Sequence, residues 1–514
     1  MNPAATAPPV AAGSARPAPP MRERAFSGAF WTILFSVCNK AATFGGQLAL
    51  AWFLSPEDFG LVAMAFSIAS VASLVSGTNL KNLLIQRQDR FEADAGQIFW
   101  LSLTMNVASG LILAALSPLA GRLFRETRVA PVILVVAFAL PIMALPTVYA
   151  AALYRDLRFR VVAQIQFCEG LIRNGLAVAL AMVGFGAYSL VLPLVASSIF
   201  AAVGCRLIVG EIPLGRPCPR LWPALLAPAG WLMAIAFVSA VQAYGVSFVI
   251  GLTHNPSVNG FYYWGFAFSS QAIFLLATNL QGVFFPVLSK LNHDSKLQQR
   301  AFRQLCQVLS FAIVPVCVLQ IVLARPLIEL LFHERWLRSV PVVQWLSVAM
   351  LTQPLSIVAN ALLLARGKYR LLACFTGFVA FAVTSAAVVG ARLGEETEIA
   401  RCTSIVLFLT NLLAGWIAYR EFHPSGASFL RVLALPLAVV APSALLAWSA
   451  VQATKNCPRL VSIVATSVAL LMAHGVAWRW LAPELVSQLK IKFYRALGNY
   501  ASVSLMPNPF SRKG

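Results

Sequence analysis

The chain has 514 residues, of which 59% are hydrophobic and only 11% are charged, and its formal net charge is +21. Soluble globular proteins carry about 25% charged residues, so the composition excludes a water-soluble enzyme, and the apolar content excludes a disordered chain. The basic excess would suit a nucleic-acid binder, but such a protein needs a polar surface that this sequence cannot supply. We therefore expect a multi-pass membrane protein with no nucleic-acid partner.

The N-terminal segment 1–25 begins with an Ala/Pro-rich run. Its prolines interrupt the continuous apolar stretch that a signal peptide needs, so we expect a disordered cytoplasmic tail. Met1 and Met21 are both candidate translation starts.

Fourteen segments are apolar enough to span a bilayer, which takes about 20 residues. They are centred near residues 40, 69, 107, 141, 173, 198, 238, 272, 314, 352, 381, 408, 440 and 470. The loops between them leave no room for a soluble domain. The sequence thus predicts an all-α polytopic fold of about 14 transmembrane helices. We divide it into a six-helix bundle over 26–210, a second over 221–422, two additional helices over 428–482 and an amphipathic cytoplasmic tail over 483–514.

Lys and Arg residues set the expected orientation. With a cytoplasmic N-terminus, the inner loops and tails hold roughly three times as many of them as the outer loops, which is the bias expected for cytoplasmic segments. Both termini are therefore expected in the cytoplasm. In the C-terminal tail, apolar residues four apart alternate with basic residues, a pattern that suits a helix lying on anionic membrane lipids. The residues are Leu485, Leu489, Lys490, Lys492, Phe493, Arg495 and Leu497.

An internal repeat supports the two-bundle division. At an offset of 200, residues 51–80 lie over 251–280 with more identities than the roughly two that average residue usage predicts. The matching pairs are Pro56/Pro256, Gly60/Gly260, Phe66/Phe266, Ser70/Ser270, Ala72/Ala272 and the run 78–80 over 278–280. A second match, at an offset of 210, places Leu153 over Leu363. Six spans separate the copies, so we expect parallel repeats with a cavity between the bundles.

Charged and polar side chains inside the spans are the candidate functional groups, because charge in the bilayer core is expensive and is normally paired or functional. Lys40 lies in the first span beside Asn39, and Gln47 follows two turns later. Glu169 and Arg173 are four residues apart in the fifth span and therefore share a helix face.

Prolines inside spans remove backbone hydrogen bonds and can bend helices. Pro146, Pro286, Pro315 and Pro354 are candidate hinges, although static bends that aid helix contacts are an equal alternative. His474 is interpreted as a packed imidazole rather than a proton relay. The scattered Cys and His residues show no metal-ligand spacing, so we expect no metal and no cofactor.

Three short motifs have an order and spacing that match a known family. They are Leu54–Gly60 (LSPEDFG), Gly77–Leu80 followed by Leu84–Arg87 (GTNL and LIQR), and Tyr154–Phe159 (YRDLRF). Together they resemble motifs of the Wzx-type lipid-linked oligosaccharide flippases of the multidrug/oligosaccharidyl-lipid/polysaccharide exporter superfamily. Lys81-Asn82 departs from the pattern, which usually has small or apolar residues there.

The first motif also reads as a helix start, with a Ser cap, Pro in the first helical turn and acids near the positive end of the helix dipole. We therefore interpret the motif residues as structural. They are Ser55, Pro56, Glu57, Gly60, Arg155, Arg158 and Phe159.

The resemblance implies a transporter, not an enzyme, that flips polyprenyl-pyrophosphate-linked oligosaccharide repeats across the bacterial inner membrane by alternating access. Such repeats serve exopolysaccharide, capsule or O-antigen synthesis. Coupling to H⁺ or Na⁺ and contact with a polymerase of the same pathway stay open.

With that substrate, Lys40 and Arg173 become candidates for binding the pyrophosphate, and Glu169, Asn39 and Gln47 for completing the site. The alternatives are that Glu169 simply neutralises Arg173, and that Lys40 snorkels or contacts a carbonyl.

Rival functions remain. A cation-coupled multidrug antiporter of the same superfamily should have an acidic cavity, whereas this one is expected to be basic. A membrane glycan polymerase or ligase should have a large outer loop, which the sequence lacks, and a lipid II flippase should be essential to its cell. The phosphate-binding loop motif of ATP-driven pumps does not occur in the sequence.

Overall fold

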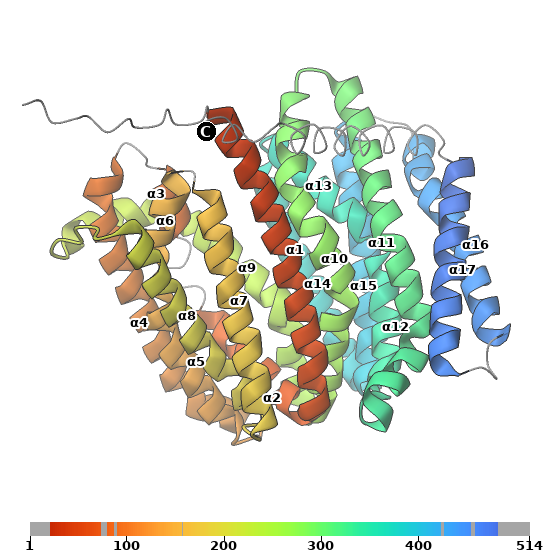
Figure 1. Cartoon of the computed structure of the whole chain (residues 1–514), viewed down its shortest axis with the longest axis horizontal. Helices are drawn as coiled ribbons and strands as arrows, with labels where there is room; N and C mark the ends of the chain where they lie inside the picture. Colours follow the sequence, from red (N-terminus) through yellow and green to blue (C-terminus); the bar gives the residue numbers. More distant parts are fainter. Residues whose placement is uncertain are drawn as a thin grey trace, which may run out of the picture.

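The structure is a computed structural model that describes residues 21–72, 80–86, 90–156, 158–422, 426–453 and 458–481. Within these ranges every regular element is helical, and Figure 1 shows the helices running side by side through the molecule. The all-α prediction is therefore confirmed. The predicted amphipathic tail over 483–514 and the first 20 residues lie outside the described ranges.

The first half of the chain forms one lobe, which we call the N-lobe. Its helices are α1 (Met21–Phe53), α2 (Pro56–Ala72), α3 (Leu80–Gln86), α4 (Phe91–Leu123), α5 (Val129–Ala144), α6 (Thr147–Arg155), α7 (Phe159–Met182) and α8 (Tyr188–Val209). Helix α1 begins at Met21, inside the segment that the sequence assigns to the tail.

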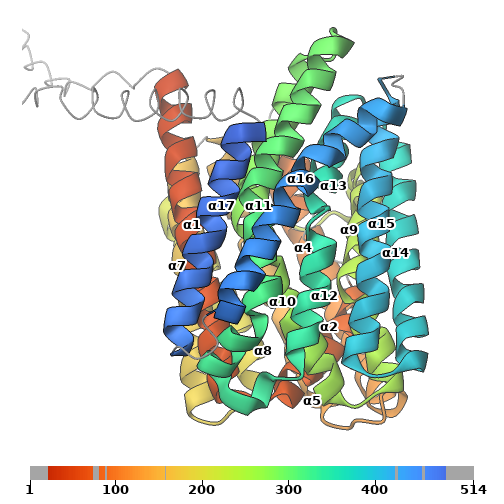
Figure 2. The same cartoon turned by 90° about the vertical axis from the view of Figure 1, so that its right-hand side faces the viewer.

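The second half forms the C-lobe. It contains η3 (Pro219–Leu221), α9 (Trp222–Thr253), α10 (Pro256–Lys290), α11 (Ser295–Phe332), η4 (His333–Trp336), α12 (Ser339–Met350), α13 (Gln353–Ala365), α14 (Tyr369–Leu393) and α15 (Glu396–Arg420). The hairpin of α16 (Gly426–Ala453) and α17 (Arg459–Leu481) packs against α11, as Figure 2 shows.

The fourteen predicted span centres each fall in a helix or, for residue 352, at a break between two helices. By length and apolar composition, seven helices of the described ranges could cross a membrane, or up to nine if each bent pair is one span. The multi-pass architecture is confirmed, and the count of fourteen spans stays a prediction.

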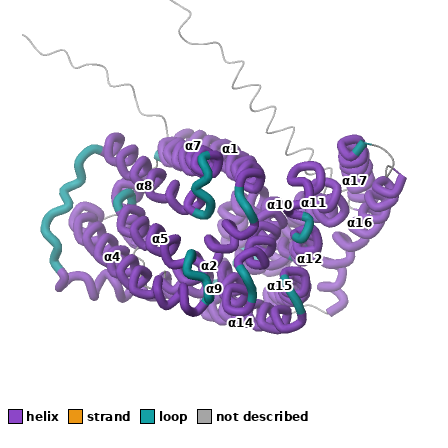
Figure 3. The backbone as a smooth tube through the Cα atoms, turned by 90° about the horizontal axis from the view of Figure 1, so that it is seen from below, coloured by secondary structure: helices purple, strands orange, loops and turns teal. Residues whose placement is uncertain are grey.

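The two lobes repeat the same helix contacts. In the N-lobe α1 packs on α7, α4 on α5 and α7 on α8, and in the C-lobe α9 packs on α14, α11 on α12 and α14 on α15. Figure 3, seen from below, shows α4, α5 and α8 on one side and α11, α12 and α15 on the other. The exact residue boundaries of the two bundles remain a proposal.

We call the two ends of the helices the upper and lower end, after Figure 1. Helices α1, α4, α7, α9, α11 and α14 finish at the lower end, and the loops that follow them are short. The Lys and Arg distribution predicts that the upper end faces the cytoplasm.

Apolar side chains cover much of the outer surface. Leu207, Phe381 and Trp480 are 79%, 73% and 80% exposed. An apolar exterior of this extent would be unusual in water and suits a lipid environment.

Two of the four candidate hinge prolines lie at breaks. Pro146 stands between α5 and α6, which are bent by 40°. Pro354 lies in the first turn of α13, which is bent by 43° from α12. Pro286 and Pro315 lie inside the continuous helices α10 and α11.

Candidate functional site

Helices α1 and α7 approach each other closely through small residues. A Cβ on Gly170 would lie 1.9 Å from Asn39 Oδ1, and one on Gly46 would lie 3.2 Å from the Asn174 side chain. Asn174 donates a 3.2 Å hydrogen bond to the Thr43 hydroxyl. The buried Asn39 Oδ1 accepts no hydrogen bond from any residue that the structure describes. Asn39 thus belongs to the α1–α7 contact.

The charged candidates lie next to this contact. Lys40 on α1 and Glu169 and Arg173 on α7 are all partly buried. The cations that act electrostatically on the Glu169 carboxylate are Arg173 and Lys81. Among the described residues no ion pair within 4.0 Å joins Glu169 to Arg173, so the interpretation that Glu169 simply neutralises Arg173 lacks a direct contact.

Gln47 links the two lobes. Its Oε1 accepts a 2.6 Å hydrogen bond from Nε2 of Gln271 on α10. Gln47 lies within the apolar contact of α1 with the C-lobe, to which Phe44, Leu48 and Leu50 contribute. The sequence placed it in the same site as Lys40, but in the structure it bridges α1 to α10.

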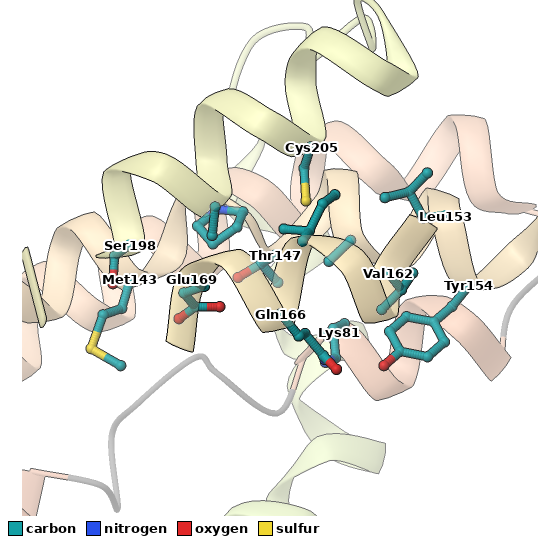
Figure 4. Close-up of a pocket in the computed structure, with 14 residues that line it drawn as sticks. Lys81, Met143, Thr147, Leu153, Tyr154, Val162, Gln166, Glu169, Ser198 and Cys205 are labelled. Atoms are coloured by element: carbon teal, nitrogen blue, oxygen red, sulfur yellow. The ribbon is translucent and has the colours of Figure 1, made fainter. Parts of the chain in front are cut away.

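A pocket of about 190 Å³ opens between α3, α5, α6, α7 and α8. Figure 4 shows Lys81, Tyr154, Gln166 and Glu169 gathered on one side of it. The other lining residues are Met143, Pro146, Thr147, Ala150, Leu153, Val162, Ile165, Ser198, Ala201 and Cys205. Polar groups therefore sit at the rim of a largely apolar hollow.

Lys81 lines this pocket, which the sequence alone did not predict. Its ammonium lies 5.2 Å from the centre of the Tyr154 ring, a cation–π distance. The only signal in the sequence was that a lysine stands where the family usually has a small or apolar residue. Of the predicted substrate-binding residues, the pocket includes Glu169 and none of Lys40, Arg173, Asn39 or Gln47.

The lower ends of the lobes are sealed by an aromatic cluster. Trp336, which is fully buried, donates a 2.9 Å hydrogen bond from Nε1 to the Ala51 carbonyl. Its ring lies edge-on to Phe59 at 5.4 Å and tilted against Trp264 at 4.8 Å. A C-lobe residue therefore closes over the end of α1.

Helices α2 and α10 meet at two glycines. A Cβ on Gly60 would lie 1.8 Å from the Pro256 carbonyl oxygen, and one on Gly260 would lie 1.7 Å from the Pro56 carbonyl oxygen. The internal repeat aligns Gly60 with Gly260 and Pro56 with Pro256. The segment around Gly60 therefore contacts its own copy in the other lobe. Only glycine allows the two backbones to come this close.

The first family motif forms the helix start that its residues predicted. Helix α2 begins at Pro56, and Asp58 N–H points to the Ser55 hydroxyl at 3.3 Å. In return, the Asp58 carboxylate accepts hydrogen bonds from the Ser55 N–H at 2.9 Å and hydroxyl at 2.7 Å. This reciprocal arrangement satisfies groups at the helix terminus that would otherwise be left open.

Glu57 of the same motif is held by the loop after α4. Arg128 donates to Glu57 Oε1 at 2.6 Å and to Glu126 Oε1 at 2.8 Å. The hydrogen bond from Arg128 lowers the pKa of Glu126 below its usual value. The motif is thus tied to the lower end of α4.

The third motif lies at the upper end. Arg155 stacks 4.2 Å from the Phe91 ring and pairs with Asp156 at 3.0 Å. Arg158 donates a 3.5 Å hydrogen bond to the Ile208 carbonyl, and Phe159 lies edge-on to Tyr154. These contacts join α4, α6, α7 and α8 beside the pocket.

His474 is buried in the contact of α17 with α11. Its Nε2 lies 3.2 Å from the Phe311 carbonyl, and its ring is 5.6 Å from the Phe311 ring. No group of three or more potential metal ligands occurs among the described residues.

The family described as "Polysaccharide biosynthesis protein" matches residues 49–341, which is more than half of the chain. The lipopolysaccharide biosynthesis protein WzxC of Escherichia coli (strain K12) is 21% identical over 440 residues, covering 84% of this chain and 88% of WzxC. The succinoglycan biosynthesis transport protein ExoT of Rhizobium meliloti is 25% identical over 394 residues, covering 75% and 79%.

Two solved structures share the fold. The lipid II flippase MurJ in an inward closed conformation aligns with a TM-score of 0.66 at 12% identity, covering 89% of this chain and 99% of MurJ. A multidrug resistance MATE family transporter in an inward-facing conformation aligns with a TM-score of 0.60 at 13% identity, covering 77% and 98%. At these identities the likeness concerns the fold alone.

Proposed function

The chain belongs to the polysaccharide biosynthesis protein family, and on that premise we propose that it flips polyprenyl-pyrophosphate-linked oligosaccharides across the bacterial inner membrane. The relatives named for lipopolysaccharide and succinoglycan biosynthesis support this substrate class. The protein acts as a transporter and not as an enzyme. Both termini face the cytoplasm, so the upper end receives the substrate and the sealed lower end faces outward.

The observation that supports the proposal is that two cations lie within helices α1 and α7, above the contacts that close the lower end. Lys40 and Arg173 are partly buried in α1 and α7, which form the side of the N-lobe nearest to the front of Figure 1. Moving a diphosphate away from water needs compensating positive charge. We assign that role to these two residues, while the polyprenyl chain stays in the lipid.

Alternating access follows from the two-lobe architecture. In this structure the lower ends are held together by Trp336 and by the glycine contact between α2 and α10. Opening toward the outside requires these contacts to separate, whereas Gln47 and Gln271 offer a weaker, polar link higher up. The energy source is proposed to be an H⁺ or Na⁺ gradient, and a polymerase of the same pathway is the proposed partner.

Reconstituted vesicles test this function. Undecaprenyl diphosphate carrying a fluorescent sugar is placed in both leaflets, and a membrane-impermeant quencher reports how much crosses under H⁺ and Na⁺ gradients. We expect the wild-type protein to flip the lipid, and Lys40→Ala and Arg173→Ala each to lower the rate about tenfold or more, which corresponds to roughly 1.4 kcal/mol. Arg392→Ala, which removes an exposed arginine at the lower end of α14, is the matched control. Unchanged rates in both test variants would show that these cations do not bind the diphosphate.

A further inference from the structure

The pocket between α3, α5, α6, α7 and α8 is not explained by binding of the diphosphate. Its rim carries Lys81, Gln166 and Glu169, and its volume is about 190 Å³. We propose that this pocket receives the sugar ring that is bonded to the diphosphate of the substrate. The inference rests on the proposed function and names the part of the substrate that the N-lobe recognises.

The size of the pocket suits one sugar. Pockets for drug-sized ligands measure about 300–1,000 Å³, so a hollow of about 190 Å³ admits a smaller group and excludes an oligosaccharide. The remaining sugars of a repeat unit would extend away from the rim, where Gln166 is exposed.

The lining chemistry suits a polyhydroxylated ring. The Glu169 carboxylate accepts hydrogen bonds, Gln166 both donates and accepts, and the Lys81 ammonium donates. Thr147 and Ser198, which are buried, add two hydroxyl groups to the lining. The apolar walls can cover the C–H faces of a sugar, so the pocket offers both kinds of surface that a pyranose presents.

The pocket and the proposed diphosphate site are in register on α7. Glu169 and Arg173 are four residues apart, which places them on one face and about 6 Å apart along the axis. A phosphate joined to a sugar spans a similar length. A ring beside Glu169 therefore leaves its diphosphate near Arg173, one turn closer to the lower end.

The corresponding place in the C-lobe is filled. The offset of 210 in the internal repeat places Gln353 over Met143 and Asn411 over Ala201. In the C-lobe, Asn411 Nδ2 donates a 2.9 Å hydrogen bond to Gln353 Oε1 across this space. In the N-lobe, Met143 and Ala201 instead line the pocket. The small residue on α8 keeps open a space that a large polar pair occupies in the other lobe.

Binding measurements on the purified full-length chain in lipid nanodiscs test the proposal. The probes are undecaprenyl diphosphate and the same lipid carrying one glucose, galactose or N-acetylglucosamine. Ala201→Leu fills the pocket. Ala196→Leu is the matched control, since Ala196 is on the same helix but lines a different, apolar groove with Phe138 and Ile199.

We expect the wild type and Ala196→Leu to bind at least one of the sugar lipids about tenfold more tightly than the bare lipid. Ala201→Leu should bring this ratio close to one while it leaves the affinity for the bare lipid within about twofold. Gln166→Ala, at an exposed position where folding is not at risk, should lower the same ratio about threefold or more.

The proposal is overturned if both Ala201→Leu and Gln166→Ala still bind the sugar lipid as much more tightly than the bare lipid as the wild type does. Equal binding of all four lipids by the wild type overturns it as well, and leaves the diphosphate site intact. If the wild type binds none of the four lipids, the proposed function fails, and this inference fails with it.

Discussion

Replacing Gly60 by alanine would force the lower ends of α2 and α10 apart. The new Cβ would stand 1.8 Å from the Pro256 carbonyl oxygen, whereas ordinary van der Waals contact begins at 3.4 Å. The helices must therefore separate by the difference, about 1.6 Å. The atom that is met belongs to the backbone, so no side-chain rotation can relieve the clash.

The size of the effect follows from the cost of crowding. Adding atoms to a tight contact destabilises it by about 1–3 kcal/mol. The contact joins the lobes at the lower end only, so its weakening favours the state that is open there. The equilibrium constant between the closed and the open state should shift toward the open state by about 5–150-fold. Gly260→Ala should act in the same direction, since its Cβ would lie 1.7 Å from the Pro56 carbonyl oxygen.

Cysteine labelling from outside the cell measures the bias. Ala51→Cys serves as the reporter, since Ala51 is 1% exposed beneath Trp336. It is placed in a background in which the natural cysteines are replaced, and a membrane-impermeant maleimide is added to intact cells. We expect Gly60→Ala to raise the labelling rate by the factor given above. Gly175→Ala is the control, because a Cβ on Gly175 meets nothing within 4 Å.

Equal labelling rates in Gly60→Ala and Gly175→Ala, at equal amounts of protein in the membrane, would refute the idea that the glycine contact holds the lower end closed. A faster rate in both variants would refute it as well, since it would trace the effect to a general loosening of the helices.

Two further predictions concern the same end of the molecule. Trp336→Phe removes the hydrogen bond to the Ala51 carbonyl, so we expect a loss of about 1–2 kcal/mol. The reporter is Ala324→Cys, because Ala324 is fully buried in the same apolar cluster as Trp336, and we expect it to be labelled faster; an unchanged rate would mean that the ring alone closes the lower end. The second prediction concerns Glu126, whose pKa is lowered by the hydrogen bond from Arg128. The ionised carboxylate therefore stabilises the folded protein. This contribution is complete above the unfolded-state pKa of about 4.3 and is lost as the pH falls through the lower folded-state pKa. The difference in thermal stability between the wild type and Glu126→Gln should therefore be constant from neutral pH down to about pH 5 and shrink at lower pH; a difference that grows on acidification would reverse the sign of this reasoning.

The local features of the fold could be predicted from the sequence. Helix positions follow from runs of apolar residues, and the start of α2 follows from Ser55, Pro56 and Asp58, whose groups interact within one turn. The sequence also singled out the charged residues within apolar segments, because ionisable residues are rare there. Each of these inferences depends on neighbours close in the chain.

The candidate site was predicted only in part. The sequence indicated Lys40 as a charge within an apolar segment and Glu169 with Arg173 as a pair on one helix face. Lys81 was interpreted as a departure from a motif and not as a neighbour of Glu169. Lys81 reaches the pocket only because α3 lies beside α6 in the folded protein. Hydropathy shows that a segment is apolar. It does not show which other helix that segment packs against, or through which face.

The sequence by itself determined that this is an all-helical membrane protein with a repeated design, because composition and periodicity are properties of the chain alone. It also aligned Gly60 with Gly260 and Pro56 with Pro256, without showing that they touch. Only the tertiary structure decided that the two motifs meet across the lobes, with each glycine against the other motif's proline carbonyl. The physical reason is that residues close to the axis relating two parallel repeats contact their own copies, and the position of that axis is set by how the helices pack.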